Sequence, residues 1–127
     1  MTPLKNFQEL IVWQKSMALV KQIYQHTSSF PKEEMFGLTS QMRRAAVSIP
    51  ANIAEGQSRN TTGEFRQFLG IAKGSLAELQ TLILLSANLD FLTQKNSSNL
   101  LMSEDVGKML NGTKELPTTH YPLITTH

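Results

Sequence analysis

The chain has 127 residues, of which 40% are hydrophobic, which is typical of one ordinary soluble domain with a single core. Its 12 Lys and Arg residues against 10 Asp and Glu residues give a formal net charge of +2, which permits contact with nucleic acid or an acidic partner without requiring it. Cysteine is absent, which excludes disulfides, thiolate zinc sites and thiol catalysis and suits a reducing compartment. No long apolar run marks a membrane span or a signal peptide, so we expect a soluble, cytoplasmic protein without membrane contact.

The first two predicted helices each carry apolar residues spaced three or four apart, as one face of an α-helix requires. In the first helix, about residues 5–27, the predicted core stripe is Leu10, Trp13, Met17, Val20 and Tyr24, and the apolar sector is widened by Val12, Leu19 and Ile23. In the second helix, about residues 32–56, the predicted stripe is Met35, Leu38, Met42, Ala45, Ile49 and Ile53. Pro50 lies inside the second helix and is expected to kink it rather than end it, because proline removes one backbone donor.

The third helix, about residues 61–90, has a clear start signal. Thr61 with Glu64 three residues later predicts a capping box. The predicted core stripe is Phe65, Leu69, Ala72, Leu76, Leu79 and Ile83. A fourth helix, about residues 94–113, contains the poor helix formers of residues 96–99 and Gly107, and its apolar residues Leu100, Leu101, Val106, Met109 and Leu110 should enter the core.

These four helices, all within residues 1–115, are joined by short connections and should therefore lie mostly antiparallel. The sequence predicts an all-α fold, an antiparallel up-down-up-down four-helix bundle in one domain, followed by an irregular C-terminal tail over residues 116–127.

Two of the predicted helices carry small or apolar residues outside their core stripes. In the second helix, Val47, Ala51 and Ala54 form an apolar strip beside a polar ridge made of Gln41, Arg44, Ser48, Asn52 and Glu55. In the third helix, Gly70 and Gly74 share the face opposite the core, and each mid-helix glycine costs about 1 kcal/mol relative to alanine. Tolerated glycine is one explanation; close approach by another subunit is the other, and we expect a homo-oligomer that uses these faces.

No residue pattern points to catalysis. None of His26, His120 and His127 lies three residues after a glutamate, as the inward-facing di-metal sites of helix bundles require. Walker A, HExxH, GxSxG and dinucleotide-binding patterns are absent. We therefore expect no enzymatic activity, no catalytic residue, no metal and no cofactor.

Positive charge concentrates between residues 43 and 73, where five cations face only Glu55 and Glu64. The candidates to contact nucleic-acid phosphates are Arg43, Arg59, Arg66 and Lys73. A solvated helix flank with structural ion pairs of the Arg44 to Glu55 kind between chains is the alternative, and the sequence leaves both open.

The run LTSQMRRAAVSIPANIAEG, residues 38–56, resembles the signature of the 23S rRNA-intervening sequence protein family, also called the S23 ribosomal protein family. Further segments match the family in order: LIVWQK at 10–15, Phe30-Pro31 with Glu34, residues 65–69 and 72–79, and KMLNG at 108–112. The resemblance covers about residues 5–112. It implies a bacterial protein, a left-handed antiparallel four-helix bundle and a ring-shaped homopentamer.

The resemblance also bears on the candidate residues. Some family members are encoded inside intervening sequences of 23S rRNA genes, and a structurally similar accessory protein of diversity-generating retroelements binds nucleic acid. The polar ridge lies in the shared motif and is assigned first to structure or to the subunit interface, whereas only Arg43 of the four cationic candidates lies there. Related chains continue helically with basic residues after Gly112, whereas Thr113 to Pro117 should stop the helix here, which argues against RNA binding by a basic C-terminal helix.

The sequence thus favours a non-enzymatic, oligomeric accessory protein that binds RNA or DNA through a basic surface. A protein–protein interaction scaffold is the alternative, motivated by helices with two apolar faces.

Overall fold

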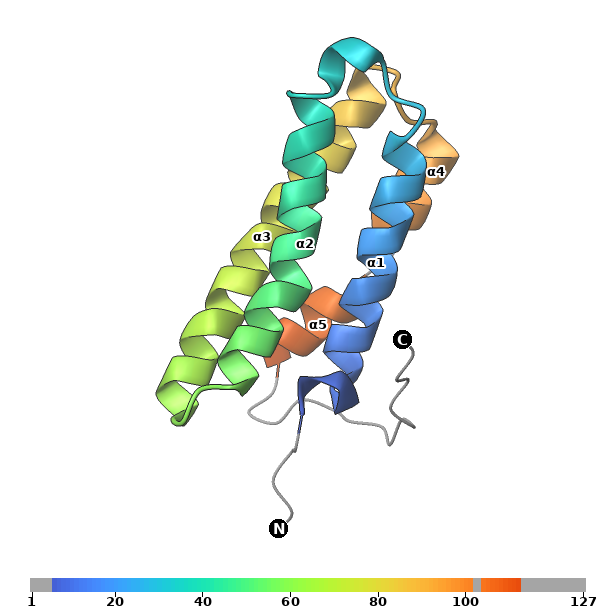
Figure 1. The fold of residues 1–127 in the computed structure, drawn as a ribbon. Coiled ribbons are helices and arrows are strands. Elements are labelled where there is room, and N and C mark those ends of the chain that lie inside the picture. Colours follow the sequence, from blue (N-terminus) through green and yellow to red (C-terminus); the bar gives the residue numbers. More distant parts are fainter. Residues whose placement is uncertain (1–5, 102–103, 113–127) are drawn as a thin grey trace.

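The structure is a computed structural model that describes residues 6–101 and 104–112. Its elements are η1 (Phe7–Glu9), α1 (Ile11–Thr27), η2 (Lys32–Glu34), α2 (Leu38–Gln57), α3 (Thr62–Asn88), α4 (Gln94–Leu101) and α5 (Glu104–Gly112), where η denotes a single 3₁₀ turn. α1, α2, α3 and α4 alternate in direction, and α5 crosses the end of the bundle near the start of α1 (Figure 1). The fold is an all-α, up-down-up-down bundle in which α4 and α5 together take the fourth position.

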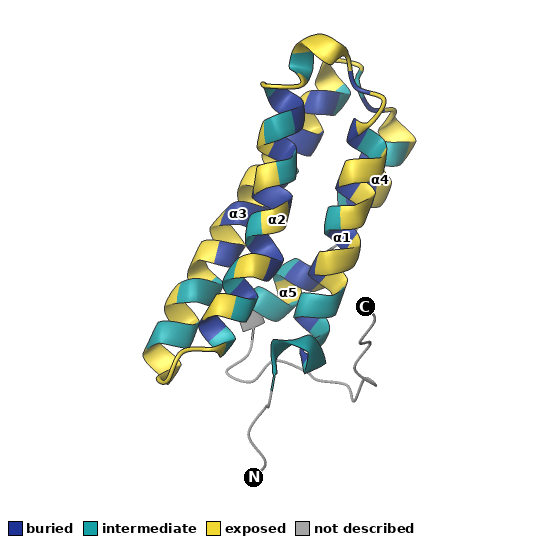
Figure 2. Cartoon of the chain, in the orientation of Figure 1, coloured by how far each residue is buried: buried dark blue, intermediate teal, exposed yellow. Residues whose placement is uncertain are grey.

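All five α-helices contribute to one hydrophobic core, which is visible as the dark inward faces in Figure 2. α2 and α3 pack along each other's length and supply the side chains of Met42, Ile49, Ile53, Leu79 and Ile83, each at most 1% exposed. The remaining helices add the buried residues Val12, Leu19, Ile23, Leu100 and Val106. The predicted stripes of the second and third helices are confirmed, except for Met35.

The predicted core stripe of α1 is confirmed only in part, because Leu10 is buried and Trp13 and Val20 pack against the core but the other two residues do not. Met17 and Tyr24 are more than 40% exposed, whereas Val12, Leu19 and Ile23 are buried. The apolar sector of α1 is too wide for periodicity to determine which side faces the core. The inner face also includes two polar residues. Ser16 Oγ donates to the carbonyl of Trp13 at 2.9 Å, and Thr27 Oγ1 donates to the carbonyl of Ile23 at 2.7 Å. Because each hydroxyl bonds its own helix, it can be buried at little cost.

Both N-terminal helices begin later than predicted. Leu10 is extended and separates η1 from α1, and the side chain of Asn6 caps η1 by accepting a bond from the amide of Gln8 at 2.6 Å. α2 starts at Leu38 rather than near residue 32, and Glu34 lies before that start, where its carboxylate accepts a bond from the Leu38 amide at 3.2 Å. α2 then continues through Pro50 to Gln57 instead of ending at the proline.

Both ends of α3 are defined by side-chain or backbone caps. Thr61 is the N-cap, and its Oγ1 accepts a bond from the amide of Glu64 at 3.1 Å. At the other end Asp90 adopts a left-handed φ of 64°. The amide of Asp90 donates to the carbonyl of Ala87 at 3.0 Å and that of Phe91 donates to Ser86 at 2.8 Å, which is the bond pattern of a Schellman cap.

The predicted fourth helix consists of two helices, α4 and α5, that run in different directions (Figure 1). Thr93 starts α4, because its Oγ1 accepts a bond from the amide of Asn96 at 3.0 Å. α5 packs against α1 and α3, and a Cβ atom added at Gly107 would lie 3.3 Å from Leu76 of α3, so its backbone approaches α3 closely. The predicted tail, residues 116–127, lies outside the described residues.

Candidate interaction surfaces

The cationic candidates lie on the αα-hairpin formed by α2 and α3, residues 38–88, hereafter the α2–α3 hairpin. Arg43 is half-buried near the start of α2, where its Nε donates to Thr27 Oγ1 at 2.9 Å. Its guanidinium lies over the ring of Tyr24, 4.5 Å from the centroid. Arg43 therefore connects α2 to the end of α1 as well as carrying charge.

Arg59 lies at the opposite end of the α2–α3 hairpin, roughly 20 Å from Arg43 along the α2 axis at about 1.5 Å per residue. Its Nη2 donates to Oε2 of Glu55 at 2.7 Å, and its guanidinium is 4.9 Å from the ring centroid of Phe68. Both members of this ion pair are more than 40% exposed, so the pair adds little stability but does neutralise one cation.

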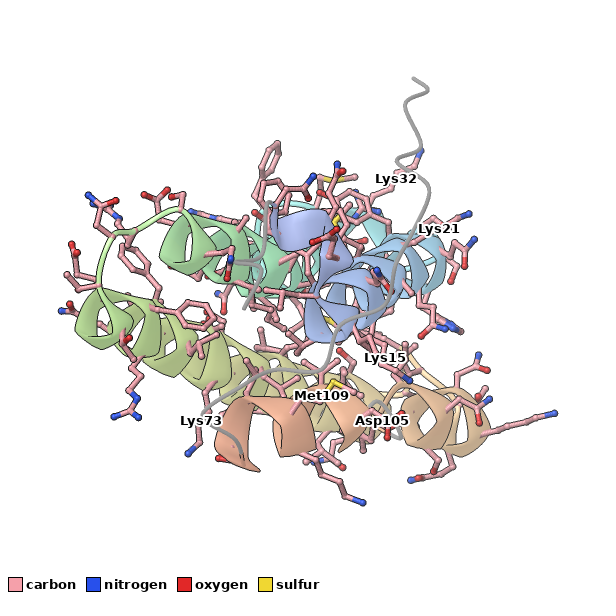
Figure 3. All side chains as sticks on the ribbon, turned by 90° about the horizontal axis from the view of Figure 1, so that it is seen from below. Lys15, Lys21, Lys32, Lys73, Asp105 and Met109 are labelled. Atoms are coloured by element: carbon pink, nitrogen blue, oxygen red, sulfur yellow. The ribbon has the colours of Figure 1, made fainter. Side chains whose placement is uncertain are left out.

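Arg66 and Lys73 are both exposed on one flank of α3, seven residues apart. Lys73 projects away from the helix in Figure 3. Within the described residues, neither side chain takes part in a salt bridge. The structure therefore distributes the four candidates along the α2–α3 hairpin: Arg43 and Arg59 hold structural contacts, and Arg66 and Lys73 form an exposed basic flank.

The predicted polar ridge divides into two parts. Ser48 Oγ lies 2.8 Å from Ser75 Oγ of α3, and Asn52 Nδ2 donates to the carbonyl and the hydroxyl of Ser48 at 2.7 and 2.9 Å. These residues form a polar connection between α2 and α3. The other ridge residues, Gln41, Arg44 and Glu55, are exposed, and Glu55 pairs with Arg59 rather than with Arg44.

The small residues predicted to face another subunit lie on the outside of this chain. Gly70 and Gly74 are exposed, and a Cβ atom added at either would meet nothing within 4 Å. Val47 and Ala51 are exposed on α2, and α3 exposes the large apolar residues Ile71, Leu84 and Leu85. No helix of the described chain makes the close approach that the two glycines predict.

An open groove of about 580 Å³ lies between the end of α1, the turn that connects η2 to α2, and the outward face of α2. This α1–α2 groove is lined by Tyr24, Met35, Phe36, Arg43, Arg44 and Val47, together with hydroxyl residues. Phe36 is 96% exposed, the most exposed large apolar residue described. This groove was not predicted from the sequence, because Tyr24 and Met35 were assigned to core stripes. The available signal was Phe36, an aromatic residue that lies outside the apolar stripe of α2.

Two further site types can be assessed in the described residues. Among residues 6–101 and 104–112, no group of three or more His, Asp or Glu side chains is arranged to hold a metal ion. α3 is long and apolar enough to cross a membrane by length and composition alone. Because α3 packs along α2 and core helices pass the same test, this property is weak evidence for a membrane span.

Comparison with known proteins identifies the family. Residues 8–112 match the family model described as 23S rRNA-intervening sequence protein. The chain belongs to this family. The match spans α1 to α5 and includes the motif of residues 38–56 on which the resemblance was noted.

A solved structure supports the fold. The crystal structure of a protein with unknown function from the S23 ribosomal protein family of Bacteroides thetaiotaomicron VPI-5482 is similar, with a TM-score of 0.70 and 23% sequence identity. The similarity covers 79% of this chain and 94% of that chain. No curated protein matches the sequence. At this identity the likeness shows the fold alone, and no comparison points to enzymatic activity.

Proposed function

We propose that this member of the 23S rRNA-intervening sequence protein family is a non-catalytic, oligomeric accessory protein that binds RNA or another nucleic acid through the α2–α3 hairpin. The supporting observation is the charge of the hairpin. Five cations between residues 43 and 73 face two carboxylates, and the described part of that segment contains one salt bridge, Arg59 to Glu55. Exposed cations without counter-charges attract phosphates. The family description refers to 23S rRNA, which makes a structured RNA the first ligand to test.

The basic flank of Arg66 and Lys73 provides the most direct test. The double variant Arg66→Gln, Lys73→Gln should bind a labelled structured RNA more weakly in sedimentation or anisotropy assays. In a plot of log affinity against log salt concentration, the slope of this variant should be smaller in magnitude by roughly 1.4 to 1.8. Each lost phosphate contact reduces that slope by about 0.7 to 0.9.

A matched control removes the same charge elsewhere. Lys21 on α1 and Lys95 on α4 are both exposed and lie outside the hairpin, so Lys21→Gln, Lys95→Gln should leave affinity nearly unchanged. Equal losses in both double variants would show that net charge matters and that the flank is not a site.

The proposed assembly is a homo-oligomer, taken as a pentamer from the family resemblance. It is supported by apolar and small residues that this chain leaves uncovered, among them Ala51, Ile71, Leu85 and Gly74. Gly74→Leu tests it selectively, because nothing lies within 4 Å of the position of the added Cβ and a single chain should accept the side chain. Light scattering should give a pentamer mass for the wild type and a smaller mass for the variant. A variant of unchanged mass would mean that Gly74 faces solvent.

A protein–protein interaction scaffold is the second candidate function. It is favoured by the three large apolar residues exposed on α3, Ile71, Leu84 and Leu85, since extended apolar patches mark protein interfaces. If this candidate is correct, a partner purified with the protein remains bound after nuclease treatment and is lost in Leu84→Asp. Loss of every partner on nuclease treatment contradicts it.

A further inference from the structure

The α1–α2 groove combines cationic and aromatic side chains without a counter-charge. Arg43 and Arg44 both line it, and none of its described lining residues is acidic. Glu34, which is close in sequence, directs its carboxylate to the Leu38 amide at the start of α2. The groove therefore complements an anionic ligand, and its volume of about 580 Å³ lies within the range of roughly 300–1,000 Å³ typical of ligand sites.

Part of the groove is fixed in advance. The Arg43 guanidinium lies over the Tyr24 ring, 4.5 Å from the centroid, and its Nε donates to the buried hydroxyl of Thr27 at 2.9 Å. A ligand that binds beside this pair does not have to immobilise a long side chain, which lowers the entropic cost of binding. Arg44, the next residue, is exposed at the groove and can contact a second negative charge on the ligand.

Phe36 supplies a flat apolar surface beside these cations. Its side chain is 96% exposed, so almost the entire ring is available to a ligand. Gly37 has a ψ of −111°, outside the helical region, and separates Phe36 from α2 so that the phenylalanine does not join the core stripe. Met35, also exposed, extends the apolar surface.

We propose that the α1–α2 groove binds unpaired nucleotides of a single-stranded nucleic acid, with a base stacked on Phe36 and a neighbouring phosphate contacted by Arg44. Sites for single strands combine aromatic platforms with cations that follow the backbone, and both components are present here. A strand repeats a phosphate at every nucleotide and so suits two adjacent arginines, whereas a peptide would need closely spaced carboxylates. Duplex bases are stacked on one another and offer no face to Phe36.

This inference rests on the proposed nucleic-acid binding and assigns it a ligand class and a site separate from the Arg66 and Lys73 flank. The first experiment measures binding of a labelled oligouridylate by fluorescence anisotropy, using the full-length protein. Phe36→Ala should weaken binding about 5- to 100-fold, as loss of one stacked base does. Arg44→Gln should reduce the slope of log affinity against log salt concentration by about 0.7.

Met17→Ala is the matched control, because Met17 is also a large exposed apolar residue but lies on α1 outside the groove. It should leave the affinity unchanged. Light scattering on each variant reports whether the assembly is intact. If the wild type binds the oligonucleotide and Phe36→Ala binds equally well, the groove assignment is overturned while the proposed function stands. If the wild type binds no RNA of any kind, both fail.

Phe36→Trp gives a second readout, in which the fluorescence of the introduced ring reports a stacked base directly. The chain has one natural tryptophan, Trp13, whose ring packs against Phe7 at 5.2 Å and is partly buried. The added tryptophan should be quenched by oligouridylate and not by inorganic polyphosphate, which carries the charge without bases. Equal quenching by both polymers, or none by oligouridylate, overturns the stacking assignment. Quenching by an acidic peptide alone would assign the groove to a protein partner instead.

Discussion

The α2–α3 hairpin and the C-terminal α4–α5 pair share one core but are built differently. α2 and α3 run antiparallel over their whole lengths, approach closely at Gly56 and are joined by the Ser48 to Ser75 bond. α4 and α5 are short, each buries few large side chains, and the ion pair of α5 with α1 lies at the surface. The hairpin carries all of the proposed binding residues except Tyr24, Met35 and Phe36. The proposed binding surfaces therefore depend on the α2–α3 hairpin, whereas α4 and α5 cover the core.

Replacing one buried leucine with alanine in each region should give the largest difference in the free energy of unfolding. Leu79 of α3 is fully buried, and Leu79→Ala should lower the free energy of unfolding by about 2–5 kcal/mol. Leu100 of α4 is 2% exposed, and Leu100→Ala should fall at the low end of that range because the short α4 can shift to fill the cavity. Urea denaturation measures both. Hydrogen exchange should show loss of protection confined to α4 and α5 in Leu100→Ala, and uniform loss across all helices in that variant would contradict the comparison.

The close approach inside the hairpin predicts the next largest effect. A Cβ atom at Gly56 would lie 2.8 Å from Cβ of Phe68 and 3.2 Å from the carbonyl oxygen of Phe65, so α2 and α3 would have to separate. Gly56→Ala should therefore lower the free energy of unfolding by about 1–3 kcal/mol, despite the better helix propensity of alanine. Gly63→Ala, at an open position near the start of α3, is the control and should be neutral or slightly stabilising. A stabilised Gly56→Ala would show that the helices do not meet there.

The N-cap of α3 predicts a smaller change. Thr61→Ala removes the acceptor for the Glu64 amide and should cost about 1 kcal/mol in thermal or urea denaturation. Thr61→Ser keeps the hydroxyl and should recover most of this loss. If serine is as destabilising as alanine, the threonine methyl group and not the cap bond is what matters.

The sequence predicts the hairpin better than the rest of the fold for a physical reason. α2 and α3 also bury the polar residues Thr39, Ser75 and Ser86, but most of their inner-face residues are apolar, such as Met42 and Leu79, so periodicity fixes both the helix and its orientation. In α1 the inner face includes Ser16 and Thr27, whose burial depends on bonds to their own backbone that a hydropathy pattern does not reveal. The change of direction between α4 and α5 depends on packing against other helices and leaves no periodic signal.

The candidate sites were predictable only in part, because the order of residues along the chain does not show which side chains meet in the fold. The concentration of cations between residues 43 and 73 is evident in the sequence, but the bond from Arg43 to Thr27 joins residues that lie on different helices. The α1–α2 groove likewise exists because α2 starts at Leu38, which leaves Phe36 outside the helix and exposed. Family membership, by contrast, was predicted from one continuous motif and is confirmed.

The ion pair between α5 and α1 predicts the smallest effect and a pH dependence. Lys15 Nζ donates to Oδ2 of Asp105 at 2.8 Å, and the two side chains meet in Figure 3. This bond, and then the charge of Lys15, holds the pKa of Asp105 below its usual value. Because the pKa is lower in the folded chain than in the unfolded chain, the pair stabilises the fold above the unfolded pKa and loses its effect as pH falls through the folded pKa.

Asp105→Asn should therefore be slightly less stable than the wild type near neutral pH, and the difference should vanish in acid, below the usual range of an aspartate pKa. The effect should also shrink in high salt, since both side chains are largely exposed. A titration of the Asp105 carboxyl by NMR gives the sharper measurement, because Lys15→Gln should raise its pKa towards the ordinary value even where the stability change is too small to resolve. If Asp105 titrates at the same pH in both proteins, α5 is not held to α1 by this pair, and the attachment of the C-terminal helices depends on the apolar contacts of residues such as Val106 alone.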